Sequence, residues 1–171
     1  RLSEYMVKKN LWVGVMTRKE GNIPTVEQRS GYLIHRIWHF GSGKFKAFTF
    51  TVGAFLTVFR YRKNFDVLHA HMEFSSAVAA TLAGKLTNKP VIVKFAASGV
   101  SREVQESMKT RLGRFRLSLL RRWASRFIAL TSEMEDELLM EGFPRDRVLK
   151  IANGVNADQF SPSADKEASK D

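Results

Sequence analysis

The feature that most constrains the fold is the stretch from Phe127 to Ile151, which predicts a strand, a helix and a second strand in quick succession. Phe127 to Leu130 is a short apolar run without polar alternation, typical of a strand buried on both faces of a parallel sheet. Val148 to Ile151 is a second such run. Two parallel strands joined by a helix form a βαβ unit with a right-handed crossover. The stretch therefore predicts an α/β protein with a doubly wound, mostly parallel sheet and helices on both faces.

The helix inside this unit has its own start and stop signals. Ser132 followed by Glu135 has the spacing of a capping box, in which the two side chains accept backbone N–H groups of the first turn. Leu138 and Leu139 supply apolar side chains for the core. Gly142 suits a left-handed residue at the end of a helix, and the proline two residues later prevents the helix from resuming.

The end of the unit carries a resemblance to a known family. After Gly142-Phe143-Pro144 and the second strand come the Asn153-Gly154 turn and then Phe160-Ser161-Pro162. This ordered series resembles the end of the N-terminal domain of family-4 glycosyltransferases, retaining enzymes of the GT-B fold. Ala152 and Asn156 stand where the family usually has proline and aspartate. The resemblance implies a Rossmann-like domain.

The resemblance also places the domain boundaries. It implies one Rossmann-like domain over residues 1–162, which is half of a GT-B fold, followed by a polar tail or interdomain linker over residues 163–171. The family's first strand and its glycine-rich turn would lie before Arg1, so the domain is incomplete at its start. A doubly wound sheet without that central strand would expose two strand edges.

Four further strands and four further helices are expected along the chain. A helix around Leu2, Tyr5 and Met6 precedes the first of them, and residues 21–30 form a polar, turn-rich segment. A small-residue helix is expected over Ala77–Leu86 and a helix of about five turns over Glu103–Trp123. The strands are Leu11–Met16, Tyr32–Trp38, Asp66–His71 and Lys89–Ala96.

Ligands of such folds bind at the carboxyl ends of the strands, which directs attention to the residues there. His71 and Glu73 follow one strand, Ser98 and Gly99 follow the next, and Asn153 and Gly154 follow the last. We expect these six residues to line a cleft for an acceptor. Many family-4 enzymes have a sugar-contacting histidine where Ser98 stands, so no catalytic residue can be assigned from the resemblance.

Metal and thiol chemistry find little support. The chain has no cysteine, which excludes a disulfide scaffold, a thiolate zinc site and a cysteine nucleophile. His69 and His71 stand two residues apart without an evident third ligand, so no metal site is predicted.

The charge predicts an anionic partner. The 28 Lys and Arg residues against 17 Asp and Glu give a net charge of +11, which suits phosphates, lipid headgroups or nucleic acid. Arg111, Arg114 and Arg121 are expected close together on one face of the helix over Glu103–Trp123, as a surface for anions. The buried stripe of that helix is expected to be Val104, Met108, Leu112, Phe115 and Leu119.

The aromatic-rich segment Phe45–Tyr61 predicts another helix, too short in its apolar part to span a membrane. Its expected core face is Phe48, Val52, Phe55, Leu56 and Phe59, with cationic residues at both ends. An alternative is a helix lying in a membrane interface. The preceding Gly41-Ser42-Gly43-Lys44 lacks the other residues of a phosphate-binding loop and indicates only a lead into the helix.

The resemblance implies the acceptor-side domain of a retaining glycosyltransferase, which moves a sugar from a nucleotide-sugar donor to a sugar or lipid acceptor. The donor pocket would lie mostly in a second domain. We therefore expect no cofactor on this domain alone and no activity from the isolated chain. The protein is expected in the cytoplasm, and peripheral binding at the inner face of the membrane is compatible with this.

Two other functions are alternatives, the first suggested by the charge and the second by the fold class. One is a basic, non-catalytic module that binds anionic membrane or another polyanion; nucleic acid ranks below membrane because no nucleic-acid motif occurs. The other is a dinucleotide-dependent dehydrogenase, which lacks support because no visible strand-to-helix turn contains Gly-x-Gly-x-x-Gly.

Overall fold

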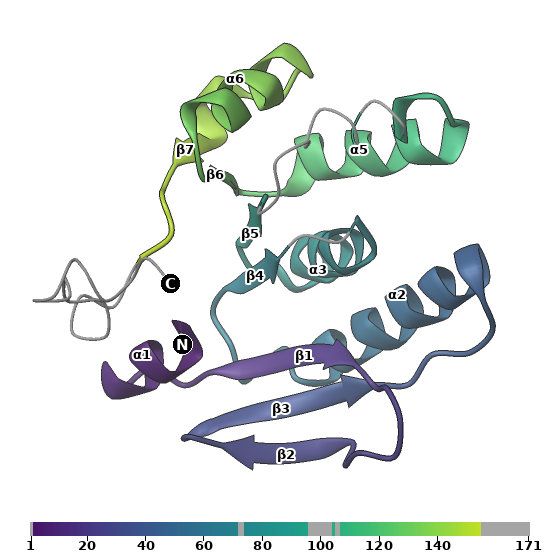
Figure 1. Cartoon of the computed structure of the whole chain (residues 1–171), viewed down its shortest axis with the longest axis vertical. Helices are drawn as coiled ribbons and strands as arrows, with labels where there is room; N and C mark the ends of the chain where they lie inside the picture. The colour runs from purple at the N-terminus through teal and green to yellow at the C-terminus, as the bar shows by residue number, and fades with distance from the viewer. Residues whose placement is uncertain (1, 72–73, 96–103, 105–106, 155–171) are drawn as a thin grey trace, which may run out of the picture.

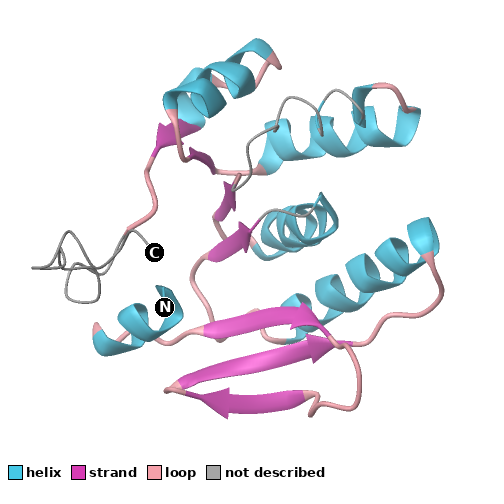
Figure 2. Cartoon of the chain, in the orientation of Figure 1, coloured by secondary structure: helices cyan, strands magenta, loops and turns pink. Residues whose placement is uncertain are grey.

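The computed structural model describes residues 2–71, 74–95, 104 and 107–154 as an α/β protein (Figures 1 and 2). Its helices are α1 (Leu2–Lys8), α2 (Gly43–Arg60), α3 (Phe74–Thr87), α5 (Arg111–Trp123) and α6 (Ser132–Met140), with a short 3-10 turn, η1 (Arg145–Arg147). Its strands are β1 (Gly14–Arg18), β2 (Val26–Arg29), β3 (Tyr32–Ile37), β4 (Leu68–His71), β5 (Val91–Lys94), β6 (Arg126–Ala129) and β7 (Val148–Lys150).

The described strands form two sheets. β4, β5, β6 and β7 lie side by side in chain order and are all parallel. The second sheet has the order β1-β3-β2, with β1 parallel and β2 antiparallel to β3. The mostly parallel α/β architecture confirms the predicted fold class.

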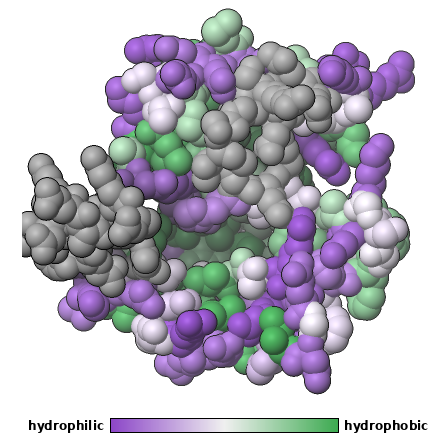
Figure 3. Space-filling view, in the orientation of Figure 1, coloured by the Kyte–Doolittle hydropathy of each residue, from purple (hydrophilic) through white to green (hydrophobic). Residues whose placement is uncertain are grey.

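The division between the sheets falls between β1 and β4, each of which pairs with a strand on one side only among the described residues. Figure 3 shows an apolar hollow at about the place where Figure 1 draws the space between these two strands. This is the position at which a doubly wound sheet has its central strand. Among the described residues, β1 and β4 therefore present the two unpaired edges expected from the sequence.

A core of apolar side chains fills the layer between the four-stranded sheet and its helices. Phe127 lies fully buried at its centre, with its ring 4.8 Å from that of Phe143 in an edge-to-face arrangement. Leu117, Leu120 and Leu138 are also fully buried. Each large apolar side chain removed from water in this way stabilises the fold by roughly 1.5–3 kcal/mol.

Helix α3 lies between α2 and α5 (Figure 1), and small residues let it approach the sheet closely. Ala77, Ala79, Ala80 and Ala83 are all buried. A Cβ added to Gly84 would lie 2.2 Å from Cγ2 of Val91. The small-residue character of this helix, expected from the sequence, is thus what brings it against β5.

The predicted strand–helix–strand unit is confirmed as β6, α6 and β7. Gly142 has φ +79°, and the backbone N–H of Phe143 donates to the carbonyl of Leu138 at 3.0 Å, as in a Schellman motif. The capping box at Ser132 and Glu135 was wrong by one residue. Thr131 is the N-cap, and its hydroxyl accepts the backbone N–H of Met134 at 3.2 Å.

Residues 21–30 contain a strand that the sequence did not suggest. β2 and β3 form an antiparallel hairpin joined by Ser30 and Gly31, which have φ of 48° and 82°. Positive φ at both central residues is the requirement of the favoured two-residue hairpin turn. The strand is polar because it lies at the edge of its sheet, with the Glu27 carboxylate accepting a hydrogen bond from Arg36 on β3.

The core face predicted for α2 was wrong. Its buried residues are Phe50, Ala54 and Val58, whereas Phe48, Val52, Leu56 and Phe59 are exposed and Phe55 is partly buried. Helix α2 is apolar on both sides, so spacing alone could not tell which side faces the sheet. The side with the smaller residues packs against α3.

The long helix expected over Glu103–Trp123 is interrupted. Lys109 and Thr110 are not helical, and the Thr110 hydroxyl caps a new helix, α5, by accepting the backbone N–H of Gly113 at 3.0 Å. The core face of α5 is Gly113, Leu117 and Leu120. Of the expected stripe, Val104 is buried, but Met108, Leu112 and Phe115 are exposed.

Candidate functional site

Three parallel segments bring polar side chains to the carboxyl edge of the four-stranded sheet. His71 ends β4 and stands in register with Lys94, which ends β5. The Lys94 ammonium donates a hydrogen bond to Oδ1 of Asn153, 2.7 Å away and three residues beyond the end of β7. Lys94 therefore brings together two of the predicted residues, His71 and Asn153. We call His71, Lys94 and Asn153 the edge cluster.

His69 adds a second imidazole to the edge cluster. Its ring stacks on that of His71 with the centroids 4.3 Å apart, because residues two apart on a strand share a face. Partial desolvation, together with the positive charges of His71 and Lys94, lowers the pKa of His69 to about 4. Desolvation and then Lys94 also lower the pKa of His71. Both imidazoles are therefore neutral at pH 7 beside one cationic lysine.

This arrangement suits binding of a hydroxyl- and phosphate-bearing ligand. A neutral imidazole can accept a hydrogen bond from a hydroxyl at one nitrogen and donate from the other. The ammonium of Lys94 attracts phosphate. Within the described part of the chain, no three His, Asp or Glu side chains are grouped as metal ligands.

The other predicted cleft residues have different outcomes. Glu73, Ser98 and Gly99 lie outside the described residues. Gly154 is exposed, and a Cβ placed on it would meet no described atom within 4 Å. Lys94 was not singled out from the sequence, although a lysine ending the buried run Val91-Ile92-Val93 was a usable signal.

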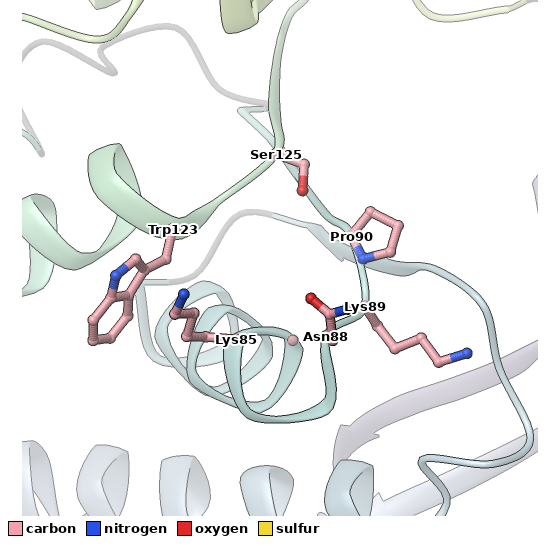
Figure 4. Close-up of a pocket in the computed structure, with 7 residues that line it drawn as sticks. Lys85, Asn88, Lys89, Pro90, Trp123 and Ser125 are labelled. Carbon is pink, nitrogen blue, oxygen red and sulfur yellow. The ribbon is translucent and has the colours of Figure 1, made fainter.

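A pocket of about 360 Å³ opens at the opposite end of the strands (Figure 4). It lies just before β5 and β6, whereas the edge cluster lies where β4 and β5 end. Trp123 and Lys85 stand at one side of it, and Lys89 points away (Figure 4). Ser125 is held there by accepting the backbone N–H of Val91 at 3.1 Å. Its place at the amino ends of the strands separates it from the edge where ligands of this fold class gather.

The three arginines predicted to form one anion-binding face differ in exposure and contacts. Arg111 and Arg114 are exposed on α5. Arg121 instead lies over the ring of Phe143, with its guanidinium carbon 5.1 Å from the ring centroid. Its Nε and one terminal nitrogen are buried without a hydrogen-bond partner among the described residues. The exposed neighbours of Arg111 and Arg114 are apolar, namely Leu112 and Phe115.

Solved structures with a similar fold include two that contain a bound nucleotide sugar. HepE from Anabaena in complex with UDP-glucose is similar with a TM-score of 0.54 and 16% identity, covering 76% of this chain and 33% of HepE. The UDP-GlcNAc 2-epimerase from Neisseria meningitidis bound to UDP-GlcNAc is similar with a TM-score of 0.51 and 18% identity, covering 71% of this chain and 31% of the epimerase. The chain spans about one third of the length of these structures. No curated protein matches the sequence.

The parallel sheet, the helices on it and these similarities define a Rossmann-like α/β domain of the GT-B kind. The family model described as "Glycosyl transferase 4-like domain" matches residues 1–154. The chain therefore belongs to the glycosyl transferase 4-like domain family, and the resemblance inferred from its sequence is confirmed.

Proposed function

We propose that this chain is the acceptor-side domain of a retaining glycosyltransferase, which moves a sugar from a nucleotide-sugar donor to a sugar or lipid acceptor. The observation that carries the proposal is the edge cluster, in which Lys94 links the ends of β4 and β5 to Asn153. This is the edge at which sheets of this class bind ligands. Membership of the glycosyl transferase 4-like domain family supplies the reaction class.

The proposed transfer breaks the bond between the anomeric carbon and the diphosphate oxygen of the donor. A bond between that carbon and the acceptor oxygen forms on the same face of the sugar, and the acceptor proton passes to the leaving diphosphate. His71 accepts a hydrogen bond from an acceptor hydroxyl, while Lys94 offsets negative charge on the acceptor. The donor is bound mainly by residues outside these 171, so we expect no cofactor on this domain alone and no transfer by the 171-residue chain.

The test replaces Lys94 and a matched lysine at the other end of the same strand. Rates of sugar transfer to an acceptor are measured, with a panel of nucleotide sugars, for the protein that carries the proposed donor domain in addition to these 171 residues. Lys94→Met is expected to lower kcat/KM for the acceptor by roughly 10- to 100-fold, since hydrogen bonds to charged groups are worth about 1.5–3 kcal/mol. Lys89→Met should change it less than about twofold, because the Lys89 ammonium lies 3.4 Å from the fully exposed Asp66 and forms a weak surface pair.

Equal effects of the two lysine variants would contradict the place assigned to the acceptor. Transfer by the 171-residue chain alone would contradict the place assigned to the donor site.

The alternative is a non-catalytic module that binds anionic membrane or another polyanion at a cytoplasmic membrane face. The net charge of +11 and the exposed Arg111 and Arg114 favour it. Sugar transfer separates the two functions, because a module of this kind transfers no sugar from any donor. Absence of transfer from every nucleotide sugar tried, together with vesicle binding, would favour the module.

A further inference from the structure

Helix α2 has an apolar face that is opposite its core face and open to solvent. At about 100° per residue, its residues Phe45, Phe48, Val52, Leu56 and Phe59 fall within an arc of roughly 80°. We call this set the outer stripe. Phe45, Phe48 and Leu56 are 60%, 58% and 58% exposed. Contiguous exposed apolar surface of this kind marks a binding site for a partner or a membrane.

The loop before α2 extends the outer stripe. The Thr49 hydroxyl accepts the backbone N–H of Phe40 at 3.0 Å and donates to the carbonyl of Phe40 at 3.1 Å, which holds this loop against α2. The side chain of Phe40 is 65% exposed. Trp38, two residues earlier, is exposed as well. Tryptophan is enriched at membrane–water interfaces.

The chain segment that carries the outer stripe has charges of one sign only. Between Gln28 and Phe65 the sequence contains no Asp or Glu. Lys44 stands at the start of α2, and Arg60, Arg62 and Lys63 stand at its end. The Arg62 guanidinium carbon lies 4.6 Å from the centroid of the Phe59 ring, so a cation sits directly at the end of the apolar stripe. An apolar stripe with cationic ends complements an anionic lipid surface.

We propose that α2 lies flat in the interface of an anionic lipid bilayer, with the outer stripe in the acyl boundary and the flanking lysines and arginines at the headgroups. No described helix is long and apolar enough to cross a membrane. A helix on the surface of a folded domain fits this interfacial geometry, because its opposite side, Phe50, Ala54 and Val58, stays in the core. The proposal does not rest on sugar transfer, since lipid binding needs no donor.

The test is co-sedimentation of the protein with vesicles, without nucleotide sugar. Vesicles of phosphatidylcholine with about one third phosphatidylglycerol should bind it at least tenfold more tightly than pure phosphatidylcholine, and added salt should weaken this binding. Leu56→Ser should lower the partition coefficient on the anionic vesicles by about tenfold or more, since it removes one large apolar side chain from the interface. Met140→Ser is the matched control, because Met140 is 87% exposed on α6.

Charge is tested separately from apolar contact. Lys44→Gln with Lys46→Gln should weaken binding to the anionic vesicles by roughly 25-fold and leave binding to pure phosphatidylcholine unchanged. All replaced side chains are at least partly exposed, so melting temperatures should stay close to that of the unchanged protein.

Two results would overturn the proposal. One is equal vesicle binding by the Leu56→Ser and Met140→Ser proteins. The other is a lipid-free dimer that Leu56→Ser converts to a monomer without any vesicle binding, which would make the outer stripe a contact between two copies of the chain.

Discussion

At the residue scale, the register between β4 and β5 places the side chains of the edge cluster next to one another. His71 and Lys94 are 23 positions apart in the sequence but directly opposite each other on β4 and β5. Two imidazoles and one ammonium on the same face cannot all be charged without repulsion. The histidines are held neutral, and this makes them hydrogen-bond acceptors at neutral pH.

The lowered histidine pKa predicts how stability depends on pH. Between pH 6.5 and about 4, His69 of the unfolded chain binds a proton that His69 of the folded chain does not. The free energy of unfolding should therefore fall as the pH is lowered through this window. His69→Gln should flatten the fall, as measured by urea unfolding at several pH values. If the free energy of unfolding changed with pH equally in the unchanged and His69→Gln proteins, His69 would have the same pKa in the folded and unfolded states, which would contradict the prediction.

The sequence located part of the edge cluster. His71 and Asn153 were predicted because both follow apolar runs that read as strands, and strand ends gather ligands in parallel sheets. The place of Lys94 in the cluster was not predicted, because it depends on the register between β4 and β5. A shift of one residue in that register would turn the Lys94 side chain to the other face of the sheet.

At the element scale, Thr131 and Ser132 make a natural pair for testing helix capping. The Thr131 hydroxyl accepts the Met134 N–H, whereas the Ser132 hydroxyl accepts a hydrogen bond from the exposed Lys150 at 3.1 Å. Thr131→Ala should lower the free energy of unfolding by about 0.5–2 kcal/mol. Ser132→Ala should cost less than about 0.5 kcal/mol. The measurement is chemical denaturation, and a larger loss for Ser132→Ala would restore the capping box first expected there.

Helix faces were harder to predict than helices. Apolar periodicity placed a helix near residues 45–61, and α2 is there, but it presents Phe50, Ala54 and Val58 to the core. In α5 the core face is likewise Gly113, Leu117 and Leu120, whereas Leu112 and Phe115 are exposed. A Cβ on Gly113 would lie 2.0 Å from the carbonyl oxygen of Ser107, so close packing selects the small residue.

At the scale of the whole molecule, the described strands form two separate sheets, with β1 and β4 on either side of the division. Among the described residues, β5 and β6 pair with a strand on both sides, whereas β1 and β4 pair on one side only. Backbone amides of β5 and β6 should therefore exchange with deuterium at least about tenfold more slowly, on average, than those of β1 and β4. Equal protection in all four strands would mean that another segment covers the edges in solution.

The sequence by itself determined the strand–helix–strand unit from β6 to β7, the parallel α/β class and the family. These depend on local patterns, namely buried apolar runs, a glycine at a helix end and turn residues at fixed offsets, which are present in any conformation of the chain. Only the tertiary structure decided which face of α2 and α5 is buried and that Lys94 joins His71 to Asn153. Each of these is a contact between segments far apart in the sequence, and its choice depends on packing and register.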